Sequence, residues 1–466
     1  VRQNDALHID IGYIDNPFEL DAFLFEIIVL GFVSTGRACV CLPTKYIFIE
    51  IAKTINHQLK DALKTAMSFK RTNLSWQYYS NFIVSNNINS PVQVVCHYLN
   101  ALEDGTIDTK DIYFTGKKAL CPLPRQKCRL LLRKYFPGPE DMSFSIARIF
   151  INVLADQLKK MTCSTFFRTQ HLQTAVGKKQ GLAVRSNLLY ALLNTCIEFA
   201  SRSVNNCRML QASAVKLDSG AESKAGEMSV GDTENLLLKR VEGMVRWEDT
   251  NHLIFVFHNQ DIQTLSAMYR KKSEVPNHIK TLFESQITKA LPDFNTKTAS
   301  ELQDILQRVA RTNPSPLGKK KLKDMAKEYA LTPDNLLKMV LIMLRIKAHV
   351  PVLIMGETGC GKTSLIRYLS QICEVYFEVV QIHAGVEEEF ILASIKHICR
   401  EAENNFKKPV WLFLDEINTC NHLGLICDVL CHHKCLGKTL PPNVVVMAAC
   451  NPYKQRPEKK VSTAGL

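Results

Sequence analysis

A glycine-rich segment at residues 356–363 has the residue types needed to hold a phosphate group. Its sequence, Gly-Glu-Thr-Gly-Cys-Gly-Lys-Thr, fits the pattern G-x-x-x-x-G-K-[ST] at every fixed position. Glycines let the backbone curl tightly and present successive N–H groups to an anion, and the positive end of a following helix adds to this field. Lys362 is expected to reach the β- and γ-phosphates of ATP, and Thr363 to place its hydroxyl on Mg²⁺. The residues expected to contact the nucleotide are Gly356, Gly359, Cys360, Gly361, Lys362, Thr363 and Ser364.

The residues on either side of this loop supply the strand and the helix that the pattern requires. Residues 350–355 form an apolar run that is typical of a buried parallel strand, and residues 364–369 read as the opening of a helix. An ordinary glycine turn between a strand and a helix is the alternative interpretation. The flanking segments favour the phosphate site, because the pattern is informative only between a strand and a helix.

A second apolar strand ends in two carboxylates. Residues 410–414 read Val-Trp-Leu-Phe-Leu and are followed directly by Asp415 and Glu416. An acid at the end of a core strand suits Mg²⁺ coordination, which we assign to Asp415. Glu416 is then expected to polarise the attacking water. The alternative, a strand that happens to end in two acids, is common when no glycine loop precedes it.

A third buried strand, at residues 444–450, ends at Asn451. In many ATPases a polar residue at this point lies between the two strands described above, and we expect Asn451 in that role to position the water or the γ-phosphate. The alternative is that Asn451 only starts a turn before Pro452, which the pair Asn-Pro favours. The order of the three polar strand ends along the chain favours the functional interpretation.

Strands and helices alternate from residue 350 onward, which predicts an α/β fold with a parallel sheet and helices on both faces. The strands are expected at residues 350–355, 375–382, 410–414 and 443–450, and the helices between them begin near Lys362, Glu387 and His422. A further helix is expected from Asp334 to about Lys347, with Thr332 as its cap and Pro333 in its first turn. It is apolar on most sides, so we expect it to be buried against the sheet.

Three segments in this order resemble an AAA+ module: residues 356–363, residues 412–418 (Leu-Phe-Leu-Asp-Glu-Ile-Asn) and residues 448–452 (Ala-Ala-Cys-Asn-Pro). The wider chain resembles the mysterin family of giant RING-finger AAA+ E3 ubiquitin ligases over most of its length. The further similar segments are residues 90–99, 105–108, 257–261 and 329–337.

The resemblance implies an ATP-driven ring attached to a ubiquitin ligase. It assigns Lys362 and Thr363 to the nucleotide loop, Asp415 and Glu416 to the metal-and-water pair, and Asn451 to the sensor. It also implies neighbouring AAA+ units in the same chain as partners, and ubiquitin machinery as a partner through regions that this sequence does not match. A cytoplasmic location, with lipid-droplet association, follows from the same resemblance.

The chain divides by pattern into three parts. Residues 1–290 form a helix-rich mixed α/β region. The helix expected at 144–158 has an apolar stripe formed by Phe144, Ala147, Ile151, Leu154, Ala155 and Leu158. A second helix is expected at 188–199, a mobile loop at 211–235 and a strand at 253–257. Because that strand ends near Asn259, much as the later strand ends at Asn451, a degenerate AAA+ unit is a second interpretation of this region. Residues 291–330 are a linker containing a short helix at 300–310. Residues 331–466 are the large subdomain of an AAA+ ATPase, which ends before the helical lid.

Two functions remain open at this stage. The first is Mg²⁺-dependent ATP hydrolysis that supports a ubiquitin ligase. The second is a nucleotide-gated scaffold with little turnover, because the lid and the arginine finger of an AAA+ module are not among these residues. We expect the chain to be a piece of a longer protein, since it begins at Val1 rather than at a methionine.

The composition limits the classes of partner that this chain is expected to bind. The net charge of +13 comes from basic residues that are spread along the chain without interleaved aromatics, so a solvated surface is favoured over a DNA or RNA groove. No apolar run is long enough to span a membrane. The 16 cysteines are scattered, which favours reduced thiols.

A cluster of cysteines and histidines at residues 420–435 invites a zinc assignment. Tetrahedral zinc sites usually draw on two separate chain segments, so an amphipathic helix with buried thiols, carrying Cys427, Cys431 and Cys435 on one face, is the preferred interpretation. The acids at residues 387–389 are interpreted as the first turn of a helix rather than as a metal site. The cluster consists of Cys420, His422, Cys427, Cys431, His432, His433 and Cys435.

Overall fold

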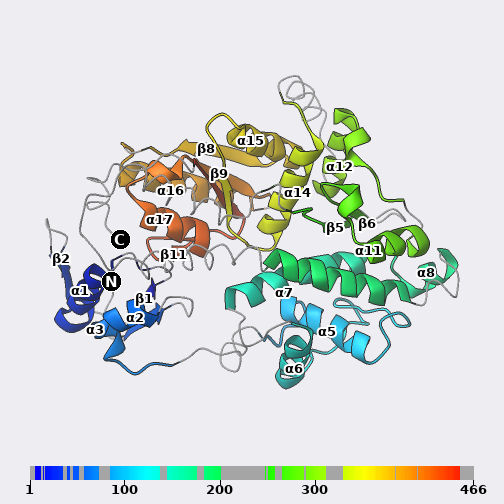
Figure 1. Cartoon of the computed structure of the whole chain (residues 1–466), viewed down its shortest axis with the longest axis horizontal. Helices are drawn as coiled ribbons and strands as arrows, with labels where there is room; N and C mark the ends of the chain where they lie inside the picture. The colour runs from blue at the N-terminus through cyan, green and yellow to red at the C-terminus, as the bar shows by residue number, and fades with distance from the viewer. Residues whose placement is uncertain are drawn as a thin grey trace, which may run out of the picture. The chain divides into compact units, whose positions relative to one another are not determined.

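The computed structural model divides the chain into two compact units (Figure 1). The smaller unit comprises residues 1–79 with 201–247, and the larger comprises residues 80–200 with 248–466. The residues that the structure describes are 6–11, 14, 16–34, 39–41, 46–51, 57–72, 84–136, 144–175, 183–200, 247, 250–257, 265–287, 290–310, 329–383, 385–406 and 408–451. The predicted loop at 211–235 and the position Asn259 lie outside these ranges. The predicted division at residues 290 and 330 stays a prediction.

The smaller unit is built around a parallel strand pair and an apolar helix. Strand β1 (Ala6–Ile11) pairs with β4 (Tyr46–Ile51), while Asn16 caps the following helix by accepting hydrogen bonds from the N–H groups of Phe18 and Glu19. Its core consists of Ile11, Ile14, Leu24, Leu63 and Ala66. The remaining elements are α1 (Pro17–Phe25), the π-helical segment η1 (Glu26–Leu30), β2 (Phe32–Ser34), β3 (Cys39–Cys41), α2 (His57–Ala62) and α3 (Lys64–Met67).

Helices form the first part of the larger unit. The central one, α7 (Phe144–Cys163), confirms the helix predicted at 144–158, and its predicted apolar stripe is buried from Ala147 to Leu158. Phe144 was predicted to share that stripe, but it is 39% exposed because it is the first residue of the helix. The predicted helix at 188–199 lies within a helix at residues 184–200. The others are α5 (Pro91–Glu103), α6 (Arg125–Tyr135) and α8 (Thr169–Ala175).

A short hairpin and a helix connect this helical part to the C-terminal sheet. Strand β5 (Ile254–Phe257) confirms the predicted strand and pairs antiparallel with β6 (Leu265–Met268). Helix α12 (Ala299–Ala310) confirms the predicted helix at 300–310. Between them lie η4 (Lys272–Glu274), α11 (Asn277–Thr281), η5 (Leu282–Gln286) and η6 (Phe294–Thr296).

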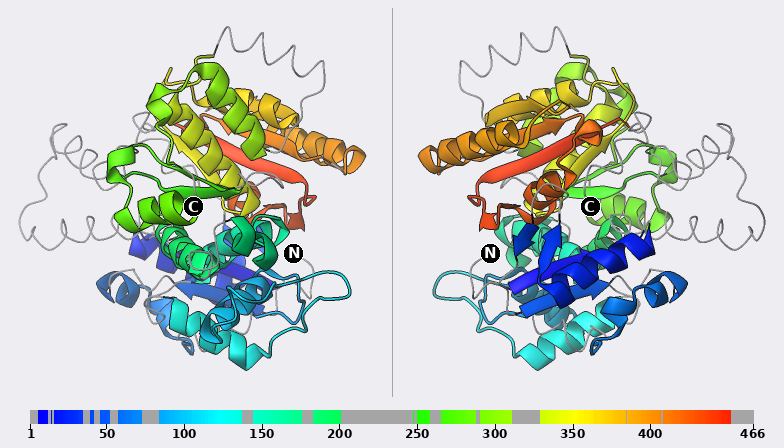
Figure 2. Two further views of the ribbon diagram at one scale, coloured as in Figure 1. Left: turned by 90° about the vertical axis from the view of Figure 1, so that its right-hand side faces the viewer. Right: turned by 90° about the vertical axis from the view of Figure 1, so that its left-hand side faces the viewer.

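The C-terminal part contains the predicted parallel sheet, with four strands in the order β7-β12-β9-β8. Figure 2 shows its strands enclosed by helices. All four predicted strands, and the predicted starts of the helices between them, are confirmed within two residues. The predicted burial of the first strand is wrong, because β7 lies at the edge of the sheet and its Leu353 and Met355 are 46% and 44% exposed. The strands are β7 (Val352–Met355), β8 (Tyr376–Gln381), β9 (Val410–Asp415) and β12 (Val444–Cys450), and the helices are α14 (Pro333–Lys347), α15 (Lys362–Cys373) and α16 (Glu388–Asn404).

Burial explains why β9 reads as an unbroken apolar run. Every residue of β9 is buried, as expected for a central strand of a parallel sheet that is covered on both faces. One face of the sheet packs against the apolar side of α16, which supplies Ile391, Ile395 and Ile398 to a shared core. Burying each such side chain contributes about 1.5–3 kcal/mol to folding. The acidic residues Glu388 and Glu389 lie in the first turn of α16, as predicted.

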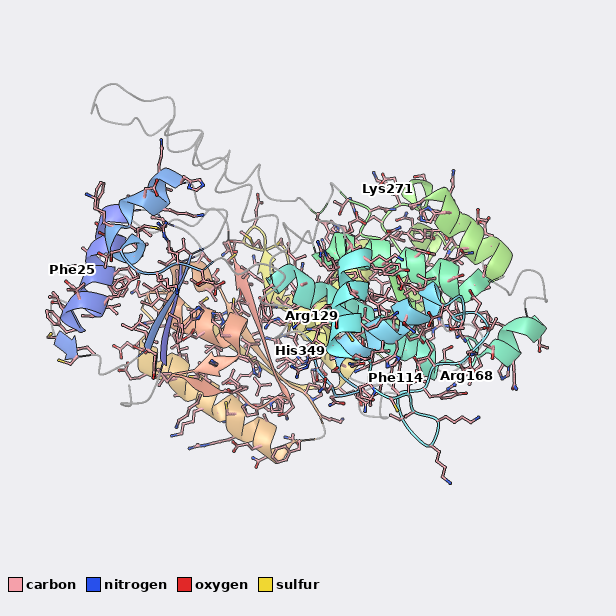
Figure 3. All side chains as sticks on the ribbon, turned by 90° about the horizontal axis from the view of Figure 1, so that it is seen from below. Phe25, Phe114, Arg129, Arg168, Lys271 and His349 are labelled. Atoms are coloured by element: carbon pink, nitrogen blue, oxygen red, sulfur yellow. The ribbon has the colours of Figure 1, made fainter. Side chains whose placement is uncertain are left out.

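Helix α14 joins the helical part to the sheet. Its predicted cap is present, because the Thr332 hydroxyl accepts a hydrogen bond from the Asn335 N–H at 3.2 Å. At its other end the Asn152 side chain, from α7, donates to the Ala348 carbonyl oxygen at 3.3 Å. His349, labelled in Figure 3, takes the left-handed conformation with φ 55° and turns the chain toward β7. The start of β7 is therefore held by a contact from the helical part.

The cysteine-rich segment differs from the prediction. It folds as α17 (Leu423–Cys427), the π-helical segment η8 (Asp428–His432) and the hairpin strands β10 (Lys434–Cys435) and β11 (Lys438–Thr439). The predicted burial of the helical thiols is wrong, since Cys427 and Cys431 are exposed. Cys435 does not share their helical face either, because the chain leaves the helix at His433, which has φ 56°. Among the described helices, none has the length and apolar content that crossing a membrane requires.

Candidate functional site

The glycine loop connects the end of β7 to the start of α15 with a geometry that only glycine tolerates at two of its positions. Gly359 and Gly361 have φ angles of 82° and 81°, in the left-handed region that L side chains rarely adopt. A Cβ atom on Gly356 would lie 2.8 Å from the Sγ of Cys360, so a side chain at this position would require the Cys360 thiol to move. The glycine spacing in the sequence therefore has a direct conformational cause.

Lys362 folds back over the loop that precedes it. Its Nζ donates to the carbonyl oxygens of Gly356 and Glu357, each at 2.9 Å, and to Asn451 Oδ1 at 2.7 Å. Asn451 is 5% exposed and directly follows β12. The ammonium group thus links the loop to the end of the neighbouring strand, although the two residues are far apart in the sequence.

Thr363 and Asp415 meet at the same edge of the sheet. The Thr363 hydroxyl donates to Asp415 Oδ2 at 2.5 Å, and the other carboxylate oxygen accepts the N–H of Glu416 at 3.0 Å. Asp415 is 7% exposed, and none of the described lysines and arginines forms an ion pair with it. A buried carboxylate beside a hydroxyl presents the oxygen ligands that Mg²⁺ prefers. This observation supports the fit of these two residues to the cation.

Glu416 is held by the Asn451 side chain. Asn451 Nδ2 donates to Glu416 Oε1 at 3.0 Å, so one amide contacts both Lys362 and Glu416. Glu416 itself has φ 58°, an uncommon conformation for a residue with a side chain. Strained backbone of this kind often occurs at functional sites, where the surrounding structure holds it in place.

Sequence reasoning missed Asn418. Its Oδ1 accepts the backbone N–H of Asn451 at 3.1 Å and so helps to fix the position of the strand end. The residue was visible as the last member of the segment Asp-Glu-Ile-Asn, but spacing alone assigned it no partner. Cys360 and Ser364 are exposed on the loop and in the first turn of α15, where a nucleotide could contact them.

Strand order explains why these residues meet. Strand β12 lies between β7 and β9, and all three run parallel. Their carboxyl ends therefore lie at one edge of the sheet, the location where open α/β sheets bind ligands. The arrangement can present loop N–H groups and an ammonium to phosphates, two oxygens to a cation, and a carboxylate to a water molecule.

Comparison with known proteins agrees with this geometry. Residues 329–454 match the family described as the RNF213 AAA domain. An E3 ubiquitin-protein ligase, rnf213-beta of Danio rerio, is 31% identical over 523 aligned positions, which cover 99% of this chain and 10% of that protein. RNF213 of Homo sapiens is 36% identical over 167 positions, covering 32% of this chain and 3% of that protein. RNF213 of Mus musculus is 36% identical over 156 positions, covering 31% and 3%.

The chain therefore spans about a tenth, or less, of the length of these curated relatives. The family match ends just past Asn451 and includes every residue of the candidate site. The resemblance found in the sequence to giant RING-finger AAA+ ubiquitin ligases is confirmed at the level of the family. The chain belongs to the RNF213 family, and residues 329–454 are its RNF213 AAA domain.

Proposed function

We propose that this AAA domain binds ATP with Mg²⁺ and hydrolyses its terminal phosphate. The observation that carries the proposal is the convergence of Lys362 and Thr363 from the loop with Asp415, Glu416 and Asn451 from two other strands. The matching family is an AAA domain, which is consistent with a nucleotide as the ligand. In this proposal Lys362 binds the β- and γ-phosphates, and Glu416 polarises the attacking water.

Thr363 and Asp415 would hold the metal. When bound, Mg²⁺ would neutralise part of the charge that develops on the phosphate oxygens. The carboxylate of Asp415 already accepts a hydrogen bond from Thr363 at 2.5 Å, so both oxygens lie close enough to serve one cation. Asp415 needs no large movement for this role, because β9 is buried along its whole length.

The Lys362–Asn451–Glu416 hydrogen bonds would form the resting arrangement of the site. For Lys362 to bind phosphate, its ammonium must leave at least some of its present acceptors, among them Asn451 Oδ1. Loss of that contact frees the Asn451 amide to rotate. Such a rotation would break the hydrogen bond from Asn451 Nδ2 that holds Glu416. In this way the arrival of the nucleotide would be communicated directly to the residue that handles the water.

In the parent protein, we propose that this domain works with neighbouring AAA+ units and supports ubiquitin transfer in the cytoplasm. The Danio rerio, human and mouse relatives are described as E3 ubiquitin-protein ligases, and the aligned part is a small share of each. Ligase activity and contacts with the ubiquitin machinery would then belong to other parts of a longer chain. The residues of this chain would supply the nucleotide response.

Binding of a fluorescent ATP analogue to the purified chain, measured with and without Mg²⁺, tests the site. We expect Mg²⁺ to tighten binding in the wild type and to lose most of this effect in Asp415→Asn. The matched control is Asp428→Asn, which removes an exposed aspartate of η8 and should leave the Mg²⁺ effect unchanged. Equal Mg²⁺ dependence in wild type and Asp415→Asn would refute the metal assignment.

Turnover is tested in the full-length parent protein, where neighbouring units can complete the site. Glu416→Gln should keep nucleotide binding and lose phosphate release, because an amide cannot act as the base. The matched control is Glu389→Gln, an exposed residue in the first turn of α16. Unchanged phosphate release in Glu416→Gln would remove Glu416 from the role of base. Binding without turnover in the wild type would instead support the nucleotide-gated scaffold.

A further inference from the structure

Two exposed cysteines share the outward side of the α17–η8 helix. The inward side of this helix packs on the sheet core through Ile426 and Val429, which are 2% and 0% exposed. Cys427 and Cys431 lie on the other side, and both are exposed. A free cysteine usually behaves as a small buried apolar residue. Packing therefore does not account for two thiols on one exposed stripe.

The two side chains are close enough to act together. Residues four apart on a helix are surface neighbours, and the Cys431 thiol is hydrogen-bonded to that of Cys427. This hydrogen bond raises the pKa of the Cys431 thiol, with burial and the charge of nearby Asp428 acting in the same direction. The Cys431 thiol therefore keeps its proton at neutral pH until a ligand displaces it.

Helical geometry disfavours a disulfide at this pair. Cβ atoms four residues apart on a helix are separated by about 5–6 Å. A disulfide needs a Cβ separation of about 3.5–4.5 Å, so oxidation would have to distort this turn. A single atom that bonds to both sulfurs does not need the two Cβ atoms to lie so close together. Bonds of about 2.3 Å in tetrahedral geometry place two sulfurs about 3.8 Å apart, which is the range of a thiol–thiol hydrogen bond.

The residues around Cys427 and Cys431 favour a ligand atom that bonds to only two thiolates. Within the described ranges, no three cysteine, histidine, aspartate or glutamate side chains are arranged to hold a metal ion. A structural zinc ion usually has four protein ligands. The nearest chain neighbours, His432 and Cys435, lie at the helix end and on β10 rather than on the stripe. Thiophilic centres with two open valences, such as trivalent organoarsenicals, do not need further protein ligands.

We propose that Cys427 and Cys431 form a dithiol site that binds trivalent organoarsenicals, with both sulfur atoms bonded to the arsenic atom. In the reaction with an organoarsenic oxide, two S–H bonds and the arsenic–oxygen bond break and two arsenic–sulfur bonds form. The two protons leave with the oxygen as one water molecule. Arsenic stays trivalent, so the step needs no oxidant or reductant.

Phenylarsine oxide is the probe, added to the reduced, desalted chain in its folded state. Free thiols are counted with a chromogenic disulfide reagent, intact mass is measured, and peptide mapping locates the modified residues. We expect one tight equivalent of arsenic that removes two reactive thiols and maps to the peptide containing Cys427 and Cys431. Cys427→Ser and Cys431→Ser should each weaken this binding at least 10-fold.

The matched control is the double variant Cys39→Ser/Cys41→Ser. Both cysteines are exposed on β3, but residues two apart on a strand are separated by about 7 Å, which is too far for one arsenic atom. This variant should bind the probe as the wild type does. Tight binding that survives in Cys431→Ser, or that disappears in the β3 variant, would overturn the proposal. Because the substituted thiols are exposed, unchanged circular dichroism is expected and shows that each variant has folded.

Discussion

Two polar networks in the larger unit show how similar residues can serve different purposes. In the helical part, Arg185 is 3% exposed and donates to Asp111 Oδ1 at 2.8 Å and to the carbonyl oxygens of Phe167 and Lys110. At the edge of the sheet, Lys362 donates to two loop carbonyls and to Asn451. Both cations have protein acceptors, but only the second lies beside an exposed loop segment, residues 357–361.

The two networks differ in whether a ligand can replace the hydrogen-bond acceptors of the cation. The Arg185 guanidinium is enclosed, and the carboxylates beside it also accept backbone N–H groups, with Asp108 Oδ1 accepting from Arg185 itself and Asp111 Oδ1 from Thr169. Arg168, labelled in Figure 3, lies over the Tyr113 ring at 4.7 Å. A saturated buried network fixes the fold. The network at the sheet edge can exchange the acceptors of Lys362 for phosphate oxygens.

The largest effect is expected from removing the buried cation. Arg185→Ala should lower the free energy of unfolding by about 3–5 kcal/mol, because it removes a buried guanidinium and leaves the half-buried Asp111 carboxylate without its charged partner. Urea unfolding measures the change, and the matched control is Lys134→Ala. Lys134 pairs with Glu103 on the surface, where solvent screens the two charges, so Lys134→Ala should leave the free energy of unfolding nearly unchanged. A loss of nucleotide affinity in the folded Arg185→Ala protein, with stability unchanged, would contradict the comparison.

Removing Lys362 should have the opposite result, with a large change in ATP affinity and a small change in stability. Lys362→Ala is expected to weaken ATP binding about 10- to 100-fold, since charge-assisted hydrogen bonds contribute about 1.5–3 kcal/mol. The free energy of unfolding should change little, because the ammonium lies at the exposed loop. A titration with the fluorescent ATP analogue measures affinity, with Lys396→Ala on the exposed side of α16 as control. If Lys362→Ala unfolds the domain while retaining affinity, the two networks do not differ as described.

Asn451 allows a sharper test, because two substitutions should act in opposite directions. Asn451→Ala removes one acceptor of Lys362 and should tighten ATP binding about 3- to 10-fold while it abolishes turnover. Asn451→Asp gives the ammonium a charged partner and should weaken ATP binding by a similar factor. Equal affinities for the two variants would show that the Lys362–Asn451 hydrogen bond does not compete with the nucleotide.

The smallest effect is expected at alkaline pH and concerns a stacked pair of tyrosines, Tyr329 and Tyr368. Burial raises the pKa of Tyr368 on α15 and of Tyr329, which stacks on it at 4.7 Å, to about 12 each. The folded state favours the neutral phenols, so this stabilisation is complete below about pH 10 and is lost as pH rises toward 12. Tyr368→Phe should flatten the pH dependence of urea unfolding in this window. The exposed Tyr190 provides the control, because Tyr190→Phe should leave the slope unchanged.

Much of the sheet and its loop could be predicted from the sequence, because their signals are local. The apolar runs at β9 and β12 reflect burial on both sides, and the glycines at 359 and 361 reflect backbone angles that other residues rarely adopt. The roles assigned to the site residues stay predictions. Where the sequence reasoning failed, at Cys427 and Cys431, helical spacing alone could not say which side of the helix would face the sheet.

The sequence by itself determined the types and order of the polar strand ends, since each follows directly from its own apolar run. It also determined where the loop must bend, because that depends on the residues of the loop alone. Only the tertiary structure decided that Asn451 contacts both Lys362 and Glu416, and that Asn418 holds its backbone. These contacts depend on β12 lying between β7 and β9, and strand order is set by packing among distant segments.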